Sequence, residues 1–393
     1  MHPIRTVLPV TWKRAVFALF AVAAGTNVPT PLLLVYQERL GLSAEVLTAL
    51  FGCYAAGLVP ALFLAGPLSD RLGRRRVALP GVVLAGLASL AFAAAGGSLA
   101  LLFTARFLQG VVSGVVFSVA SAWVAELSAA SGEGAGGRRA AVAMTAGFSL
   151  GPLTSGLLGQ FAPAPTVLPY LLHTVLVGVG LALAVRVPET VVLRPGRRRD
   201  DGDPAVPLLP PGSLGLAATV LAPVAVCVYA FPSSVISAVP LLGQLPAGGV
   251  AVTGVLAGVT LGAGTVVAGL QRRRGSWTAV TGAALGAVGY ATAALFVATG
   301  AWPWLLAAAP LLGSGGGLCL AAGLTVTGRL AAPTRRGELT SVFLACAYLG
   351  FAVPFLMATA VRSAPAWVPL GVAAALTGLL AVRLFPVARR DRL

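Results

Sequence analysis

Long apolar segments alternate with short polar ones along almost the whole chain. Each apolar segment has about 20 residues or more, the length that a helix needs to cross the hydrocarbon core of a bilayer. We predict twelve membrane-spanning helices in two sets of six. The first set covers residues 15–37, 46–66, 77–96, 100–126, 140–162 and 167–187. The second set covers residues 214–236, 249–270, 278–299, 303–327, 339–361 and 366–386.

The two sets are separated by residues 191–213, which are rich in Pro, Gly and charged residues and lack a helical apolar stripe. This composition is typical of a flexible linker. We therefore predict an N-terminal six-helix bundle (1–190), a cytoplasmic linker (191–213) and a C-terminal six-helix bundle (214–393). The halves also show a weak internal repeat, as in transporters that arose by duplication.

The composition excludes a soluble fold. Of the 393 residues, 58% are hydrophobic and 10% are charged, and the mean hydropathy is +0.92. A soluble protein of this composition would have too little polar surface to cover itself. The net charge of +16 does not indicate nucleic-acid binding, because the basic residues lie in short clusters between apolar segments. We predict an all-α integral membrane protein that has the lipid bilayer as its solvent.

The basic residues also predict an orientation. If both termini are cytoplasmic, all but three of the 27 Lys and Arg residues fall on the cytoplasmic side. Cytoplasmic loops hold the excess of positive charge in membrane proteins. We therefore expect a multi-pass protein of the cell membrane with both termini in the cytoplasm, with Arg39 and Arg362 outside and Arg106 within the bilayer.

The sequence GPLSDRLGRRRV, Gly66 to Val77, is a charged turn between the second and third predicted helices. Asp70 ends the second helix, and a negative group against the N-terminus of another helix gains roughly 0.3 to 1 kcal/mol. Gly66 permits a close helix approach, and Gly73 permits a sharp turn of the backbone. Arg75 and Arg76 are expected mainly to fix the topology.

Arg106, in the sequence RFLQGVVSG, is the basic residue predicted well inside a span. A charge at that depth is costly enough to indicate a function. Gln109 follows one turn later and is expected on the same face. The alternative is that the Arg106 side chain extends to the outer surface from a depth of roughly 9 Å.

Few polar groups are predicted within the spans. Pro29 and Pro31 predict a break in the first helix that frees backbone carbonyls for a ligand or water. The acids fall at or beyond the ends of the spans, so His173 is the titratable candidate inside, unless it is a packed and hydrogen-bonded residue. A cavity with so little charge suits a neutral or weakly charged amphipathic substrate. The candidate cavity residues are Asn27, Thr30, Tyr54, Arg106, Gln109, Ser113, His173, Tyr229 and Tyr348.

No metal site or cofactor is predicted. The four cysteines lie inside apolar segments without a neighbouring His or acid. The aspartates of the linker, Asp200, Asp201 and Asp203, are expected to be solvated. An intramembrane enzyme would need a Ser-His pair, an acid pair or a metal cluster inside the bilayer. The predicted spans hold no such set, so we do not expect an enzyme.

Three motifs of the chain resemble motifs of the major facilitator superfamily, and the resemblance covers essentially the whole chain. GPLSDRLGRRRV resembles the superfamily's signature between helices 2 and 3, and RFLQGVVSG resembles its helix 4 motif. GFSLGPLTSG, Gly147 to Gly156, resembles the helix 5 motif of its drug:proton antiporters, and VPET at residues 187–190 is a common companion. The resemblance implies two pseudo-symmetric six-helix bundles that alternate access to a central cavity.

The resemblance also implies roles for single residues. Asp70 would face the start of the predicted helix at 339–361 and latch the two halves, and Arg74 would pair with an acid, for which Glu126 is suitably placed. Arg106 would act in proton coupling or substrate binding. The small residues of the helix 5 motif would let helices pack closely, and Pro152 would bend the helix. The motif residues concerned are Gly147, Gly151, Pro152 and Gly156.

The leading hypothesis is a secondary transporter of the multidrug efflux type. It would export a small lipophilic compound as a monomer, and proton antiport is the family's expectation, which the absence of acids within the spans weakens. An uptake symporter or facilitator for a neutral solute such as a sugar is the alternative within transport. A sensor that kept the transporter fold is a further alternative.

Overall fold

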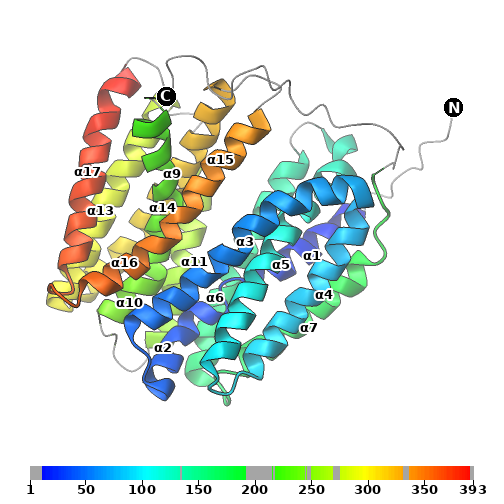
Figure 1. Ribbon diagram of the computed structural model, residues 1–393, viewed down its shortest axis with the longest axis horizontal. Helices are drawn as coiled ribbons and strands as arrows, with labels where there is room; N and C mark the ends of the chain where they lie inside the picture. Colours follow the sequence, from blue (N-terminus) through cyan, green and yellow to red (C-terminus); the bar gives the residue numbers. More distant parts are fainter. Residues whose placement is uncertain are drawn as a thin grey trace. The chain divides into compact units, whose positions relative to one another are not determined.

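The computed structural model of the protein describes residues 11–132, 135–191, 215, 217–243, 245, 249–268, 275–330 and 336–389. Every regular element within these residues is a helix (Figure 1). The predicted linker at 191–213 lies outside the described residues except for Val191. The charged cluster at residues 272–274 also lies outside them.

The N-terminal part contains seven α-helices within the described residues. They are Thr11–Gly25 (α1), Pro29–Leu40 (α2), Ala44–Leu72 (α3), Arg74–Ala93 (α4), Leu99–Leu127 (α5), Ala135–Phe161 (α6) and Leu168–Ala184 (α7). A short 3-10 turn, Ala129–Ser131, follows α5.

The C-terminal part contains more interrupted helices. Its α-helices are Ala222–Ser233 (α9), Val239–Leu242 (α10), Gly249–Ala268 (α11), Thr278–Thr299 (α13), Trp302–Leu330 (α14), Arg336–Tyr348 (α15), Val353–Ala360 (α16) and Val368–Arg389 (α17). Two π-helical turns, Ala217–Leu221 and Ser234–Ala238, flank α9. The 3-10 turns Gly275–Trp277 and Leu349–Ala352 precede α13 and α16.

The membrane fold predicted from hydrophobicity is confirmed. Among the described residues, eleven helical segments are long and apolar enough to cross a membrane, and α7 is a shorter apolar helix of 17 residues. Thr11–Leu40 counts as one span although the chain is broken between α1 and α2, and Leu339–Ala360 counts as one across α15 and α16. Each predicted segment corresponds to one of these twelve.

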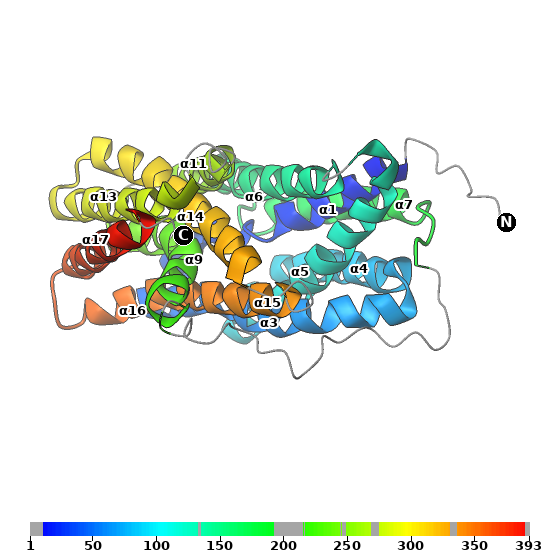
Figure 2. The same ribbon diagram turned by 90° about the horizontal axis from the view of Figure 1, so that it is seen from above.

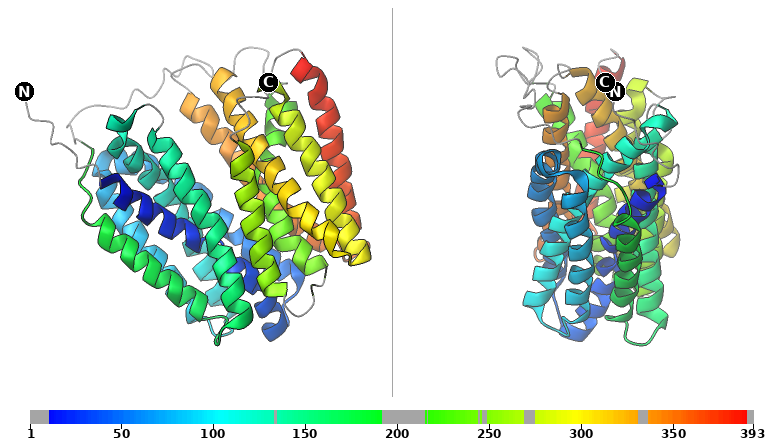
Figure 3. Two further views of the ribbon diagram at one scale, coloured as in Figure 1. Left: turned by 180° about the vertical axis from the view of Figure 1, so that it is seen from behind. Right: turned by 90° about the vertical axis from the view of Figure 1, so that its right-hand side faces the viewer.

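The structure contains two compact units, residues 1–36 with 53–195 and residues 37–52 with 196–393. In the first unit α1 packs against α5, α6 and α7, and α4 packs against α5 and α7. Figures 2 and 3 show α6 and α7 running beside α1. In the second unit α14 packs against α9, α11 and α13, and α13 packs against α17. The first span and the span that contains α9 are therefore the most buried of their units.

Small residues bring several of these helices into backbone contact. A β-carbon on Gly110 of α5 would overlap the carbonyl oxygen of Tyr54 on α3, and one on Gly114 would overlap the backbone at Leu58. In the second unit, a β-carbon on Gly313 of α14 would overlap the backbone of Thr260 on α11. Close backbone approach through small residues is a main source of helix association where lipid removes the hydrophobic driving force.

We predict that Gly110→Ala lowers the thermal unfolding temperature of the detergent-solubilised protein, because the added methyl group has no space and overpacking costs about 1–3 kcal/mol. Gly178→Ala is the matched control, since a β-carbon on Gly178 of α7 meets no atom within 4 Å. Alanine is the better helix former by about 1 kcal/mol, so this control should be neutral or slightly stabilising. Equal unfolding temperatures for the two variants would contradict the packing argument.

Candidate functional site

The turn between α3 and α4 carries a cluster of charges on one arginine. Arg74 Nη1 lies 2.6 Å from Asp70 Oδ1, and Arg74 Nη2 lies 2.9 Å from Glu126 Oε1 on α5. The same guanidinium donates from Nε to Glu126 at 3.1 Å and from Nη1 to Ser69 Oγ at 2.5 Å. The Arg74 side chain is only 12% exposed, so these charge-assisted bonds are partly shielded from water. The structure thus brings Asp70, Arg74 and Glu126 together, and their action as a latch stays a prediction.

The two glycines of this turn differ in their surroundings. Gly73 has a φ of 103°, which favours glycine, and a β-carbon there would overlap the carboxylate of Glu189. A β-carbon on Gly66 would meet Ser118 Oγ at 3.5 Å, an ordinary van der Waals contact. Gly73 is therefore required by the local backbone, whereas the first unit leaves room for a methyl group at Gly66.

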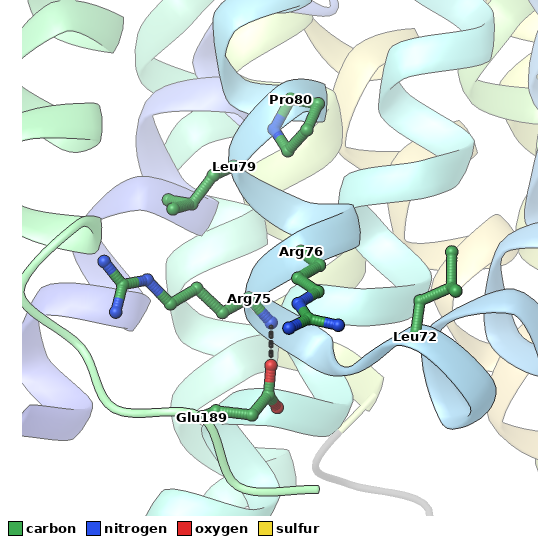
Figure 4. Close-up of a pocket in the computed structure, with 6 residues that line it drawn as sticks. All are labelled: Leu72, Arg75, Arg76, Leu79, Pro80 and Glu189. Carbon is green, nitrogen blue, oxygen red and sulfur yellow. Dashed lines mark hydrogen bonds between the residues drawn. The ribbon is translucent and has the colours of Figure 1, made fainter. Parts of the chain in front are cut away.

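Glu189, which follows α7, caps the N-terminus of α4. Its two carboxylate oxygens accept hydrogen bonds from the backbone N–H groups of Arg74 and Arg75, each at 2.9 Å. Figure 4 shows the bond to Arg75. The first N–H groups of a helix have no partner within the helix, and the first turn of α4 contains arginines and no acid. A carboxylate at this end therefore satisfies the donors and complements the helix dipole.

Other residues near Glu189 also form hydrogen bonds with α4, with α5 and with the charge cluster around Arg74. We call residues 185–190 the strap, because they hold the ends of α4 and α5 together. Trp123 Nε1 of α5 donates to the carbonyl of Pro188 at 3.0 Å, and Arg75 Nη2 donates to the carbonyl of Val185 at 2.7 Å. Thr190 Oγ1 donates to Glu126 Oε2. Glu126 is thus held from two sides, by Arg74 and by the strap.

Arg106 is buried in the first unit, with 2% of its surface exposed. Its Nη1 donates to the backbone carbonyl of Thr26 and to Gln109 Oε1, both at 2.6 Å. Its guanidinium also lies over the ring of Tyr54 on α3, 4.8 Å from the centroid. Gln109 Nε2 donates in turn to the carbonyl of Gly25 at 2.6 Å. Arg106 therefore points into the protein and does not extend to the surface.

The acceptors of Arg106 and Gln109 come from the break between α1 and α2. In a continuous helix the carbonyls of Gly25 and Asn27 would accept from residues 29 and 31, but both are prolines and have no N–H. Thr30 N donates to Asn27 O at 3.1 Å and so leaves the carbonyl of Thr26 for Arg106. The carbonyl of Gly25 keeps a 3.2 Å bond from the backbone N–H of Val28 and accepts the bond from Gln109 in addition. The prolines thus remove regular helical donors next to the carbonyls that two side chains of α5 bind.

His173 of α7 lies beside the same part of α1. Its Nε2 lies 2.9 Å from the carbonyl oxygen of Ala21, and its Nδ1 lies 2.6 Å from Ser89 Oγ on α4. A carbonyl only accepts, so Nε2 carries a proton and donates to it. The ring fills the space where a β-carbon on Gly25 would lie. This geometry is that of a packed, hydrogen-bonded histidine that joins three helices.

The other predicted cavity residues fall into two groups. In the first unit Ser113 donates to the carbonyl of Gln109 at 2.7 Å, and Asn27 Nδ2 donates to Thr26 Oγ1 at 3.3 Å. In the second unit the rings of Tyr229 and Tyr348 stack with centroids 4.7 Å apart, and their hydroxyl groups lie 3.5 Å apart.

The Gly-Pro motif lies in the middle of α6 and packs against α1. β-Carbons on Gly147 and Gly151 would overlap the backbone of α1 at Phe20 and Ala24. Pro152 and Gly156 are buried, and α6 continues past Pro152 without a break. This contact lies directly before the break that Arg106 and Gln109 bind.

These features match a known family. The profile of the Major Facilitator Superfamily matches residues 15–290. The chain belongs to this superfamily. It is therefore a multi-pass membrane protein of a transporter superfamily, as the sequence motifs predicted.

Two similar curated proteins are drug efflux proteins, matched over part of their length. The multidrug resistance protein MdtL of Shewanella oneidensis is 40% identical over 85 residues, which are 22% of this chain and 21% of that protein. The quinolone resistance protein NorA of Staphylococcus aureus is 25% identical over 169 residues, which are 41% of this chain and 43% of that protein. The chain thus spans less than half the length of either relative.

Solved transporter structures match the whole chain in fold. A peptide transporter in complex with sulfate has a TM-score of 0.80 at 16% identity and covers 98% of this chain and 95% of its own. The nucleoside transporter NupG has a TM-score of 0.73 at 12% identity and covers 97% of this chain and 99% of its own. At these identities the likeness establishes the fold alone.

We predict that Glu189→Ala speeds hydrogen exchange at the amides of Arg74 and Arg75. The loss of a helix cap costs about 1 kcal/mol, so local opening should become about fivefold more frequent. Hydrogen-exchange mass spectrometry of the detergent-solubilised protein measures this directly.

The control is Glu189→Gln, which keeps one oxygen as an acceptor and should show a smaller increase in exchange. Thr190→Val removes the hydroxyl bond to Glu126 but leaves the cap. Hydrogen exchange at the amide of Arg75 should therefore be the same in this variant as in wild type. Unchanged exchange in Glu189→Ala would contradict the capping role.

Proposed function

We propose that the protein exports small lipophilic compounds by alternating access, as a multidrug efflux transporter. The observation that carries this proposal is the assembly of α1, α5 and α6 in the first unit. There the antiporter-type motif of α6 packs against α1 next to the break whose carbonyls Arg106 and Gln109 bind. The partial similarity to MdtL and NorA supports the same assignment.

The break between α1 and α2 supports substrate binding near Arg106. Thr30 is 1% exposed, and within the described residues its hydroxyl oxygen has no hydrogen-bond partner. A buried hydroxyl without a partner is costly, so a polar atom of a substrate or a water is expected there. Arg106 and Gln109 bind the neighbouring carbonyls of Thr26 and Gly25, so this polar group lies beside the break without a net negative charge.

The charge cluster at residues 70–74 supports a conformational role. In our proposal Asp70 faces the N-terminus of α15 when the two halves close on the cytoplasmic side, and Arg74 and Glu126 fix its position. Both termini are cytoplasmic in this orientation, since the basic turns then face the cytoplasm. The driving ion is the proton, as in the antiporters whose motif the chain carries.

We predict that the purified protein in liposomes, given an imposed pH gradient, moves lipophilic dyes or fluoroquinolones against their own gradients. Asp70→Asn should reduce the initial rate by about tenfold or more while insertion and monomeric elution are kept, because the neutral amide no longer complements a helix N-terminus. Glu38→Gln is the matched control, since Glu38 is an exposed acid near the C-terminal end of α2 and is not part of the turn between α3 and α4.

Two results would contradict the proposal. Equilibration of a neutral sugar, with no gradient-driven movement of any dye, would favour the facilitator. Wild-type transport rates for Asp70→Asn would contradict the proposed role of Asp70 as a latch.

A further inference from the structure

A pocket lies where α3 ends and α4 begins, beside the strap (Figure 4). It has a volume of about 550 Å³. Three of its lining residues are apolar (Leu72, Leu79 and Pro80) and three are charged (Arg75, Arg76 and Glu189). The pocket lies at the end of two membrane spans, so it is at the depth of lipid headgroups.

The charged groups of the pocket are not equally available. Both oxygens of Glu189 accept from the N-terminus of α4, and Arg75 Nη2 is bound to the carbonyl of Val185. Arg76 makes no hydrogen bond or ion pair within the described part of the chain, and its side chain is exposed. The guanidinium of Arg76 is therefore available to a ligand. The pocket has a net positive charge, because two arginines and one acid line it. A guanidinium matches the oxygens of a phosphate group.

The surface above the pocket is apolar. Leu64, Leu68 and Leu72 recur every four residues on α3, and they are 70%, 47% and 45% exposed. On α4, Pro80 is followed at helical spacing by Leu84 and Leu87, which are 38% and 50% exposed. Residues at this spacing share a face of their helix, so an apolar track runs along each helix and ends at the pocket. These tracks fit acyl chains.

We propose that this pocket binds the headgroup phosphate of an anionic phospholipid, with Arg76 as its main contact and the acyl chains along α3 and α4. A basic pocket between membrane helices is the kind of site that recognises anionic lipids. An amphiphile fits both the charge and the apolar tracks, whereas free phosphate fits the charge alone. Lipid binding at this pocket does not depend on what the protein transports.

The test is native mass spectrometry of the full-length protein in detergent, titrated with dioleoyl phosphatidylglycerol. We expect Arg76→Gln to weaken binding of the first lipid about fivefold, the effect of one basic residue near an anionic headgroup. Arg71→Gln is the matched control, because it removes the same charge from the same turn but Arg71 does not line the pocket. It should leave the affinity within about twofold of wild type. Arg76→Lys should retain most of the affinity.

Further probes separate the possible ligands. Dioleoyl phosphatidylcholine, which has a phosphate but no net charge, should bind more weakly than phosphatidylglycerol, and Arg76→Gln should remove that difference. Inorganic phosphate at millimolar concentration should not compete with phosphatidylglycerol. The proposal is overturned if Arg76→Gln binds phosphatidylglycerol like wild type, if Arg71→Gln loses as much affinity, or if inorganic phosphate displaces the lipid. Size-exclusion chromatography shows whether each variant is folded before it is titrated.

Discussion

A guanidinium buried in the apolar interior of a helix bundle must find acceptors there. Arg106 is 2% exposed, and the desolvation of a charge costs several kcal/mol even after relaxation. The acceptors come from the break between α1 and α2, where Pro29 and Pro31 prevent two backbone hydrogen bonds. The prolines and the arginine are therefore linked. Without Arg106 the carbonyl of Thr26 would lose its side-chain donor, and without Gln109 the carbonyl of Gly25 would keep only the 3.2 Å bond from Val28 N. This exchange of backbone bonds for side-chain bonds holds α1 to α5, and the packing of α6 and α7 is built on α1.

The same rule explains the turn between α3 and α4. A helix that begins with three arginines has unpaired N–H groups and a positive dipole end beside positive side chains. Glu189 supplies the carboxylate from a distant part of the chain, and the strap then carries Thr190 to Glu126. The charges of Asp70, Arg74 and Glu126 therefore do not act as an isolated ion pair. The strap, which follows α7, forms hydrogen bonds with both α4 and α5 beside them. A movement of this turn during transport must carry all three helices with it.

Much of the fold follows from hydrophobicity, because in lipid each helix satisfies its own backbone and its length is set by the bilayer. The helix at residues 278–299 has the bounds that the sequence predicts. The proximity of Arg74 and Glu126 was expected from the family's motif, and the break at Pro29 and Pro31 from local chemistry. The sequence did not predict which side chains donate to the carbonyls at that break, since Thr26 and Arg106 are 80 residues apart and nothing in their spacing links them. Glu189 was also missed as a cap, although a first turn without an acid or a capping side chain is a signal that α4 needs one from elsewhere.

The most direct test of this account is a double-mutant cycle between Pro29→Ala and Gln109→Leu, followed by thermal unfolding in detergent. Alanine at position 29 adds the i+4 backbone N–H that a regular helix would offer to the carbonyl of Gly25, which now has the 3.2 Å bond from Val28 N and the bond from Gln109. Gln109 should then contribute less at that carbonyl. We predict that Gln109→Leu costs about 1–2 kcal/mol in the native background and clearly less in the Pro29→Ala background, which is a coupling of about 1 kcal/mol. Equal losses in the two backgrounds would contradict the claim that the side chains of α5 replace the bonds that the prolines remove.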